Sequence, residues 1–326
     1  MDNLFHKLSE LVGDNEFRIF QNDLAEKVYD TLAQGFSRRD NEVALVTKLV
    51  ETVNGNEYGK LRFHASKIHG SASYVEFNYR AKPVTKELAD MLIISLATYK
   101  RKRVFQKISL VQNKITRDKH WSIDEEQLFL LKNFPIFKSG RGIFKDLPFN
   151  DIVFSNHSGC LGSFGLFMEP GEMIFLSAPL VCEVMKGKSV SIDDIKIIES
   201  IMGGQSSTIL PFMIDPRYLD EFFHYHGKMG PWPSALPFMN LGNMPVMNNR
   251  LFCRDIYDLI RNWTQFNIGE PTFAFGRVIN QQLQGFADGI MRRIGLADIV
   301  ELTDNEIKGE FNNNLGVFVN HLELSE

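Results

Sequence analysis

Three polar residues beside two apolar runs have the types and spacing of a hydrolytic site. Asp90 stands directly before an apolar run at 91–97, and Gln112 and Lys114 stand two residues apart in the next run, 104–115. Alternate residues of a strand share one face, so a carboxylate, an amide oxygen and an ammonium would converge if the two strands are neighbours. Hard oxygen ligands hold Mg²⁺, which polarises a phosphate and lowers the pKa of a bound water, and a lysine offsets developing charge. The pattern therefore predicts metal-assisted phosphodiester hydrolysis.

Strands must position these residues. The runs at 87–97 and 104–115 are nearly continuous in apolar residues, which is typical of central strands buried on both faces. The basic segment 99–103 between them predicts a hairpin turn. Residues 61–70 and 73–79 also read as strands, with Gly70-Ser71 between them.

Helices flank these strands on both sides along the chain. Residues 4–34 read as helical, and residues 40–53 predict a helix that Asp40 or Asn41 caps. Ser122 and Glu125 have the S-x-x-E spacing of a capping box, which predicts a further helix that ends at Pro135. The order of helix, three or four strands and helix indicates an α/β unit around a small sheet.

The segment with Asp90 and Lys114 resembles the PD-(D/E)xK, or restriction-endonuclease-like, nuclease superfamily. In that fold an Asp begins the second core strand and an acid-x-Lys pair lies on the third. Some bacterial members have Q-x-K, as Gln112 to Lys114 have here, and an E-L-x-D block like Glu87 to Asp90. The resemblance covers residues 40–138. It implies a central mixed sheet flanked by helices, Mg²⁺ or Mn²⁺ as cofactor, DNA as substrate and a setting in restriction or phage defence.

The resemblance also implies roles for individual residues. Asp90 would bind the metal, Glu42 is the best match for a glutamate of the family's first helix that reaches the metal, and Lys114 would act on the attacking water. Gln112 replaces a carboxylate, so its amide oxygen would complete or orient the site without adding charge. Metal affinity would then depend on Asp90 with Glu42 or another acid, for which Glu51, Glu76 and Glu87 are weaker candidates.

Two alternatives stay open at this point. With Gln112 in place of an acid, the same fold could serve as a catalytically inactive nucleic-acid-binding or assembly module. A third reading is an unrelated phage or bacterial structural protein, which predicts that Asp90 and Lys114 lie far apart.

Basic residues around the two central runs predict contacts with nucleic-acid phosphates beside the active edge, although a solvated turn is the plainer interpretation. They are Lys100, Arg101, Lys102, Arg103, Lys107, Arg117 and Lys119.

The turn-rich stretch 139–151 predicts a boundary between a nuclease core with N-terminal helices at 1–145 and a mixed α/β region at 146–326 that serves recognition, oligomerisation or regulation. In this second region we expect strands near 152–154 and 173–178. We expect helices at 191–202, 255–264 and 278–294. Homo-oligomerisation stays open.

Composition narrows the class of protein. The net charge of −4 excludes a uniformly basic surface, so a local patch must bind any nucleic acid. Three scattered cysteines without a CxxC pair argue against a zinc knuckle and fit a reducing cytoplasm. The first ten residues lack the apolar core of a signal peptide, and no long apolar run predicts a membrane span. Weaker candidates are His64 and His69 for contact with phosphate, His224 and His226 with Asp220 and Glu221 for a metal, and Cys160 with His157 for a nucleophile.

Overall fold

The two apolar runs form the centre of the main sheet, as predicted. Strands β5 (Met91–Tyr99) and β6 (Lys102–Thr116) are antiparallel neighbours, with Met91 opposite Val111. Every residue of β5 except Tyr99 is buried, because both faces of the sheet are covered. The computed structural model describes residues 10–11, 13–68, 74–139, 152–154, 159–202, 208–209, 249–274, 277–299 and 315–324.

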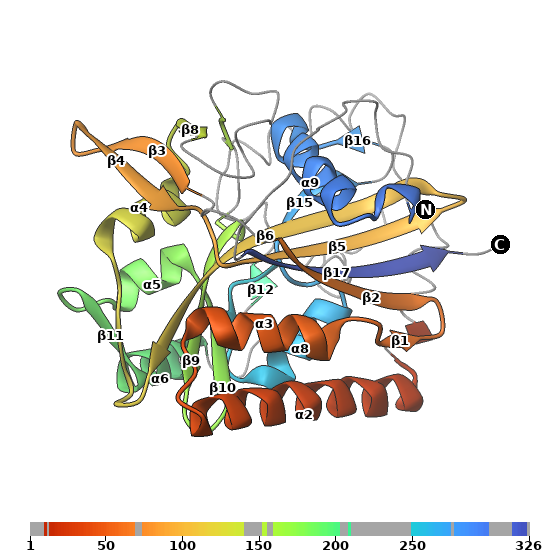
Figure 1. The fold of residues 1–326 in the computed structure, drawn as a ribbon, viewed down its shortest axis with the longest axis horizontal. Helices are drawn as coiled ribbons and strands as arrows, with labels where there is room; N and C mark the ends of the chain where they lie inside the picture. Colours follow the sequence, from red (N-terminus) through yellow and green to blue (C-terminus); the bar gives the residue numbers. More distant parts are fainter. Residues whose placement is uncertain are drawn as a thin grey trace, which may run out of the picture.

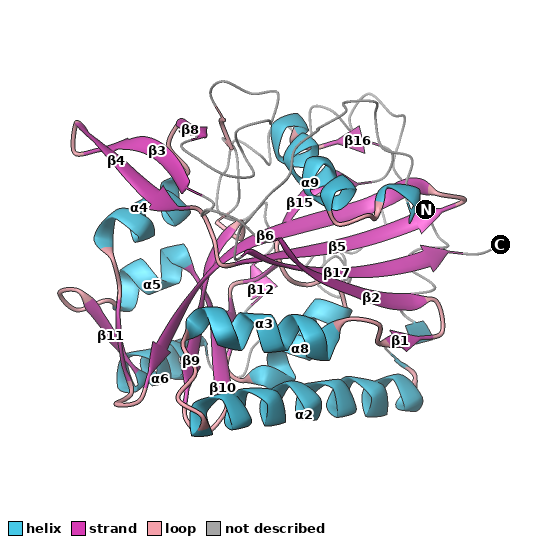
Figure 2. Ribbon diagram, viewed as in Figure 1, coloured by secondary structure: helices cyan, strands magenta, loops and turns pink. Residues whose placement is uncertain are grey.

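Among the described residues, ten strands make up the main sheet. Their order is β1-β2-β17-β5-β6-β9-β10-β14, with β15 paired to β6 and β16 paired to β15 (Figures 1 and 2). The pairs β17–β5 and β6–β9 are parallel and the other pairs are antiparallel, so the sheet is mixed. The remaining strands of this sheet are β1 (Glu57–Tyr58), β2 (Leu61–Ile68), β9 (Gly162–Met168), β10 (Glu172–Ser177), β14 (Phe252–Cys253), β15 (Glu270–Ala274), β16 (Arg277–Val278) and β17 (Leu315–Leu324).

Helices cover both faces of this sheet and enclose two hydrophobic clusters. One face carries α2 (Asn15–Ser37), α3 (Glu42–Val53) and α8 (Ile256–Thr264). The other carries α4 (Glu125–Asn133), α5 (Ala178–Val184), α6 (Ile192–Met202) and α9 (Gln281–Arg293), with the short η5 (Ala297–Ile299) after α9. The mixed α/β class and most of the predicted helices are therefore confirmed.

Smaller sheets lie beside the main one among the described residues. They are β4-β3-β8, β11-β7 and β12-β13, formed by β3 (Tyr74–Tyr79), β4 (Lys82–Glu87), β7 (His120–Ser122), β8 (Phe137–Ser139), β11 (Ser189–Ser191), β12 (Thr208–Ile209) and β13 (Asn249–Arg250). The predicted strand at 73–79 thus belongs to a different sheet from its predicted neighbour at 61–70.

Helix α4 connects two parallel strands, β6 and β9, across one face of the sheet. Its cap is Asp124, whose carboxylate accepts hydrogen bonds from the main-chain N–H groups of Glu126 and Gln127. The predicted cap at Ser122 is wrong, because Ser122 ends strand β7 and pairs with Ser189. A carboxylate two residues closer to the helix reaches the first-turn donors directly.

The last strand of the chain lies inside the sheet. Strand β17 separates β2 from β5, with Val319 opposite His64 on one side and Ile94 on the other. Strand β15, also from the second half, pairs with β6. The main sheet therefore crosses the boundary predicted at 139–151, and strands from 1–145 and 146–326 share one structure.

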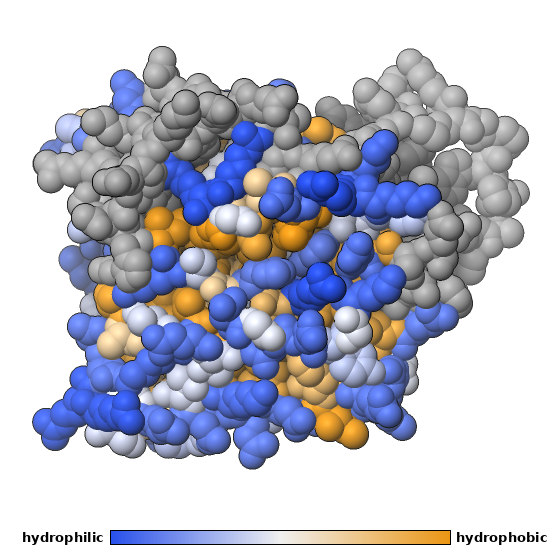
Figure 3. Space-filling view, turned by 45° about the vertical axis from the view of Figure 1, so that its right-hand side comes forward, coloured by the Kyte–Doolittle hydropathy of each residue, from blue (hydrophilic) through white to orange (hydrophobic). Residues whose placement is uncertain are grey.

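The described surface mixes polar and apolar residues. Hydrophilic side chains cover much of the face shown in Figure 3, with hydrophobic ones between them. Exposed large apolar side chains include Ile19 on α2, Ile136 after α4 and the neighbouring Val278 and Ile279. Among the described residues, no helix has the length and apolar character needed to cross a bilayer.

Close contact between α4 and β9 gives a test of this fold. A Cβ at Gly162 would lie 2.1 Å from the main-chain oxygen of Leu131, so Gly162→Ala should lower the free energy of unfolding by about 1–3 kcal/mol. The control is Gly13→Ala, whose new Cβ would meet nothing within 4 Å. Urea unfolding measures both, and equal stability of the two variants would contradict the β6–α4–β9 packing.

Candidate active site

Asp90 lies where three strands meet. Its main-chain N–H donates to the carbonyl oxygen of Val111 on β6 at 3.0 Å, and its carbonyl oxygen accepts from Gly316 on β17 at 2.9 Å. Leu88 and Ala89, directly before it, are fully buried. The main chain of Asp90 is thus fixed from both sides, which fixes the origin of its side chain.

The carboxylate of Asp90 faces β6. Its Oδ2 atom accepts a hydrogen bond from the main-chain N–H of Asn113 at 2.7 Å and a second from Nε2 of Gln112. Its Oδ1 atom makes no hydrogen bond within the described part of the chain. The structure therefore brings Asp90 and Gln112 into direct contact, and one carboxylate oxygen stays open to a ligand.

Gln127 on α4 sets the orientation of the Gln112 amide. Its Nε2 donates to the main-chain oxygen of Glu87 at 3.2 Å and also to Oε1 of Gln112. A main-chain carbonyl only accepts, so the Gln127 amide group must present its nitrogen on this side. The oxygen of Gln112 consequently faces Gln127, and its N–H faces Asp90. This differs from the expectation that the Gln112 oxygen faces a metal.

Burial and like charges act on the Asp90 carboxyl group. The pKa of Asp90 is raised to about 8, mainly by loss of hydration and next by the neighbouring carboxylate of Glu87. The hydrogen bond from Asn113 and the ammonium of Lys114 oppose this shift, while Glu42 adds to it. A negative charge at Asp90 is therefore costly without a cation beside it.

Lys114 and Glu42 both lie beside the next part of β6. Glu42, in the first turn of α3, accepts a hydrogen bond through Oε1 from the main-chain N–H of Ile115 at 2.9 Å. This bond joins α3 to β6 one residue beyond Lys114. The Lys114 ammonium forms no hydrogen bond or ion pair with any residue that the structure describes. The ammonium of Lys114 is near enough to lower the pKa of Asp90, which differs from the wide separation that the third reading predicts.

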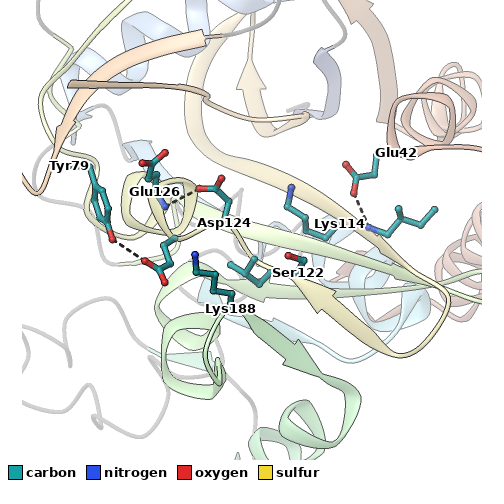
Figure 4. Close-up of a pocket in the computed structure, with 10 residues that line it drawn as sticks. Glu42, Tyr79, Lys114, Ser122, Asp124, Glu126 and Lys188 are labelled. Atoms are coloured by element: carbon teal, nitrogen blue, oxygen red, sulfur yellow. Dashed lines mark hydrogen bonds between the residues drawn. The ribbon is translucent and has the colours of Figure 1, made fainter. Parts of the chain in front are cut away.

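Glu42 and Lys114 line a cleft of about 650 Å³, a volume within the range of ligand sites (Figure 4). Its described lining is Glu42, Tyr79, Lys114, Ile115, Ser122, Ile123, Asp124, Glu125, Glu126 and Lys188. Asp90 and Gln112 are outside this lining. They adjoin it, because Gln112 is two residues from Lys114 on β6 and bonds Gln127, the residue after Glu126.

Two of the three predicted metal ligands, Asp90 and Glu42, have an oxygen that could bind a metal ion. Asp90 and Glu42 each offer a carboxylate oxygen without a hydrogen bond to a described residue, and hard oxygens suit Mg²⁺ or Mn²⁺. Gln112 does not fit as a ligand in the orientation observed, since its oxygen is engaged by Gln127. Over the described ranges, no three His, Cys, Asp or Glu side chains are grouped to hold a metal ion.

The basic turn lies away from this site. Lys100 and Arg101 follow the far end of β5. That end, Tyr99, is eight residue steps from Met91, which corresponds to about 26 Å along a strand. The expectation that this turn borders the active edge is therefore wrong, because the antiparallel pairing of β5 and β6 puts the turn and Asp90 at opposite ends. Lys102 is exposed at that same distant end.

Other members of the basic set are engaged. Lys107 is fully buried at 1% exposure, where loss of hydration lowers its pKa to about 7, so it cannot contact nucleic acid in this structure. Arg103 forms a buried ion pair with Asp288 of α9 at 2.5 Å. Arg117 pairs with Glu169 at 2.8 Å, and Lys119 is exposed after β6.

The weaker acidic and nucleophilic candidates are dispersed. Glu51 is exposed on α3, and Glu76 is exposed on β3 of a separate sheet. Cys160 is buried, and His64 on β2 is half-buried with a pKa lowered by loss of hydration. The candidates His69, His157, Asp220, Glu221, His224 and His226 lie outside the described residues.

Two residues of this region were not anticipated from the sequence. Gln127 is a polar residue among the buried positions of α4, beside Leu128, Leu130 and Leu131, and that mismatch is the signal that could have identified it. Lys188 enters the cleft from the second half of the chain. No local pattern places it there.

Comparisons of the chain with protein-family models, with curated proteins and with solved structures each gave no match. The likeness of Asp90 and Gln112-x-Lys114 to the nuclease superfamily therefore depends on these residues and on their placement.

The Gln112–Asp90 contact predicts the effect of a charge change. Gln112→Glu would put a second carboxylate against Asp90, and each would raise the pKa of the other. A carboxyl group with a raised folded-state pKa contributes stability that is present below about pH 4 and is lost as pH rises through the folded-state value, about 8 in wild type. Thermal unfolding in EDTA should therefore show a larger loss of stability at pH 8 than at pH 5.

The matched control is the exchange Asp90→Asn with Gln112→Glu. It restores one carboxylate beside one amide, so its stability should depend less on pH than that of Gln112→Glu alone. Equal pH dependence of the two proteins would show that the Gln112 side chain does not face Asp90.

Proposed function

We propose that this chain is a metal-dependent nuclease of the restriction-endonuclease-like kind that hydrolyses phosphodiester bonds in DNA. The observation that carries the proposal is the placement of Asp90, Lys114 and Glu42 at one end of β5 and β6, where Lys114 and Glu42 both act on the charge of Asp90. Within the described part of the chain, one carboxylate oxygen of Asp90 and the ammonium of Lys114 have no hydrogen-bond partner there, and Lys114 lines a cleft.

The order of the elements supports the family assignment. Counted from β2, the long strands of the first half in the main sheet are β2, β5 and β6. Asp90 precedes the second and Gln112-x-Lys114 lies on the third, which is the arrangement that the resemblance implies. Helix α3 comes before these strands and provides Glu42. The likeness to the superfamily also favours a setting in restriction or phage defence.

Each residue has a role in this proposal. Asp90 and Glu42 would hold Mg²⁺ or Mn²⁺, and the chemistry supplied with the ion bound would be polarisation of the phosphate and a lowered pKa of a water. Lys114 would orient the attacking water and offset charge that develops on the phosphate. Gln112 and Gln127 would hold the Asp90 carboxylate in place through their chain of hydrogen bonds.

A second function has one specific observation in its favour. Gln112 turns its N–H, not its oxygen, toward Asp90, so it adds no ligand to the metal site. The same fold could then bind nucleic acid or a protein partner without cleaving a substrate. Metal-dependent cleavage separates the two functions.

The nuclease proposal predicts cleavage of plasmid, linear duplex or single-stranded DNA with Mg²⁺ or Mn²⁺ and none with EDTA. Asp90→Ala should abolish cleavage, and Lys114→Ala should reduce its rate by at least about 100-fold, because the charge that develops on the phosphate loses its stabilising partner. Glu42→Gln should have a smaller effect, a rise in the metal concentration that gives half of the maximal rate. Gel-based rates at several metal concentrations measure all three effects.

Asp23→Ala on α2 and Lys60→Ala before β2 are suitable controls, since both side chains are exposed and neither lines the cleft. Cleavage that survives both Asp90→Ala and Lys114→Ala would place the active site elsewhere. Binding of DNA without any cleavage would favour the second function.

A further inference from the structure

One wall of the cleft comes from a segment remote in sequence from β5 and β6. Lys188 lines the cleft together with Lys114, and Figure 4 shows the two side chains on either side of Ser122 in that view. Lys188 belongs to the turn before β11 and Lys114 to β6. The cleft thus carries an ammonium group from each half of the chain.

The turn that holds Lys188 is tightly fixed. Main-chain hydrogen bonds join Lys186 and Ser189 in both directions, at 2.9 and 3.2 Å, and Gly187 has a φ of +63° that glycine adopts without strain. The carbonyl oxygen of Lys188 accepts from the N–H of Ile123 at 2.8 Å. Because Ile123 also lines the cleft, this bond fixes the position of Lys188 relative to the cleft floor.

The two lysines of this turn differ in their partners. Lys186 forms an ion pair with Asp194 of α6 at 2.5 Å. Lys188 is exposed and forms no hydrogen bond or ion pair with any described residue. Its charge therefore remains available to a ligand in the cleft, as does the charge of Lys114.

Three acids of the cleft, Asp124, Glu125 and Glu126, are engaged by other groups. Lys86 contacts Asp124 at 2.6 Å and Glu126 at 2.8 Å. Asp124 also caps α4, and Glu125 accepts from the hydroxyl of Tyr79 at 3.4 Å. Among the described residues that line the cleft, the cations without partners are Lys114 and Lys188. The fourth acid of the lining, Glu42, accepts from the main-chain N–H of Ile115 and is the acid that the proposed function assigns to the metal.

We propose that Lys188 and Lys114 form a phosphate-binding site in this cleft. Lys188 binds a backbone phosphate of a nucleic-acid strand while Lys114 faces the phosphate to be cleaved; the identity of the strand rests on the proposed function. An ammonium is a suitable point charge for a phosphate oxygen, and such contacts position a strand without reading its sequence. The substrate is then held by contributions from both halves of the chain.

The test uses full-length protein with Asp90→Asn in EDTA, so that cleavage and metal binding play no part. Fluorescence anisotropy with labelled single-stranded and duplex oligonucleotides gives Kd at several salt concentrations. Lys188→Gln, added to the Asp90→Asn protein, should weaken binding by about 3- to 10-fold. It should also lower the slope of log Kd against log salt by about 1, the amount expected for the loss of one phosphate contact. Lys188→Arg should restore most of the affinity, because it restores the charge.

Lys196→Gln on α6 is the matched control, since this lysine is exposed, pairs only with Asp193 at 3.2 Å and does not line the cleft. Thermal unfolding of each variant confirms folding. An unchanged Kd and salt slope in Lys188→Gln, or no binding of either oligonucleotide, would overturn the proposal. Loss of binding in Lys102→Gln with none in Lys188→Gln would move the strand to the β5–β6 turn and overturn it too.

These outcomes are separate from the fate of the nuclease proposal. Oligonucleotide binding that depends on Lys188, without cleavage by wild type, would retain the phosphate site and remove catalysis. Metal-dependent cleavage by wild type, together with normal oligonucleotide binding by the Lys188→Gln protein, would retain catalysis and remove the phosphate site.

Discussion

The carboxylate of Asp90 is held where an isolated negative charge is costly. Main-chain bonds to β6 and β17 fix its position. Gln127 orients the amide of Gln112, whose N–H donates to the same carboxylate oxygen as the main-chain N–H of Asn113. Burial and the nearby carboxylate of Glu87 oppose ionisation more strongly than these donors favour it. Oδ1 of Asp90 and the ammonium of Lys114, which have no hydrogen-bond partner among the described residues, then define the chemistry that the site can support.

Charge is distributed unevenly around this point, which explains how an acidic chain could bind an anionic polymer. The net charge is −4, yet three acids on one wall of the cleft are bound by Lys86, the α4 N-terminus or Tyr79. Lys114 and Lys188 have no such partners among the described residues. Local pairing, and not the total charge, therefore determines which charges of the cleft remain open to a ligand.

Part of this arrangement could be predicted from the sequence because it follows from local patterns. Two apolar runs joined by a short turn must pair as neighbours, so Asp90 at the start of one and Gln112 near the end of the other had to meet. The helix at Glu42 carried its own cap in Asn41. The orientation of the Gln112 amide could not be predicted, because a helix residue, Gln127, decides it.

The features that could not be predicted from the sequence depend on pairing between strands that are distant along the chain. The insertion of β17 between β2 and β5 depends on the competition of distant strands for the same edge, which no local spacing records. Lys107 and Arg103 looked like surface cations beside a basic turn, yet α9 and β15 cover that part of β6. Lys188 reaches the cleft only because β11 pairs with β7.

Calorimetric titration of Mg²⁺ and Mn²⁺ into the metal-free protein tests the central claim most directly. Titrations at pH 7 in two buffers with different ionisation enthalpies would report both binding and proton release. Since the pKa of Asp90 is raised to about 8, its carboxyl group is mostly protonated at pH 7, and cation binding should release close to one proton. Asp90→Asn should abolish the binding. Binding of the same strength and proton release in Asp90→Asn, or no binding to wild type, would contradict a metal site at Asp90.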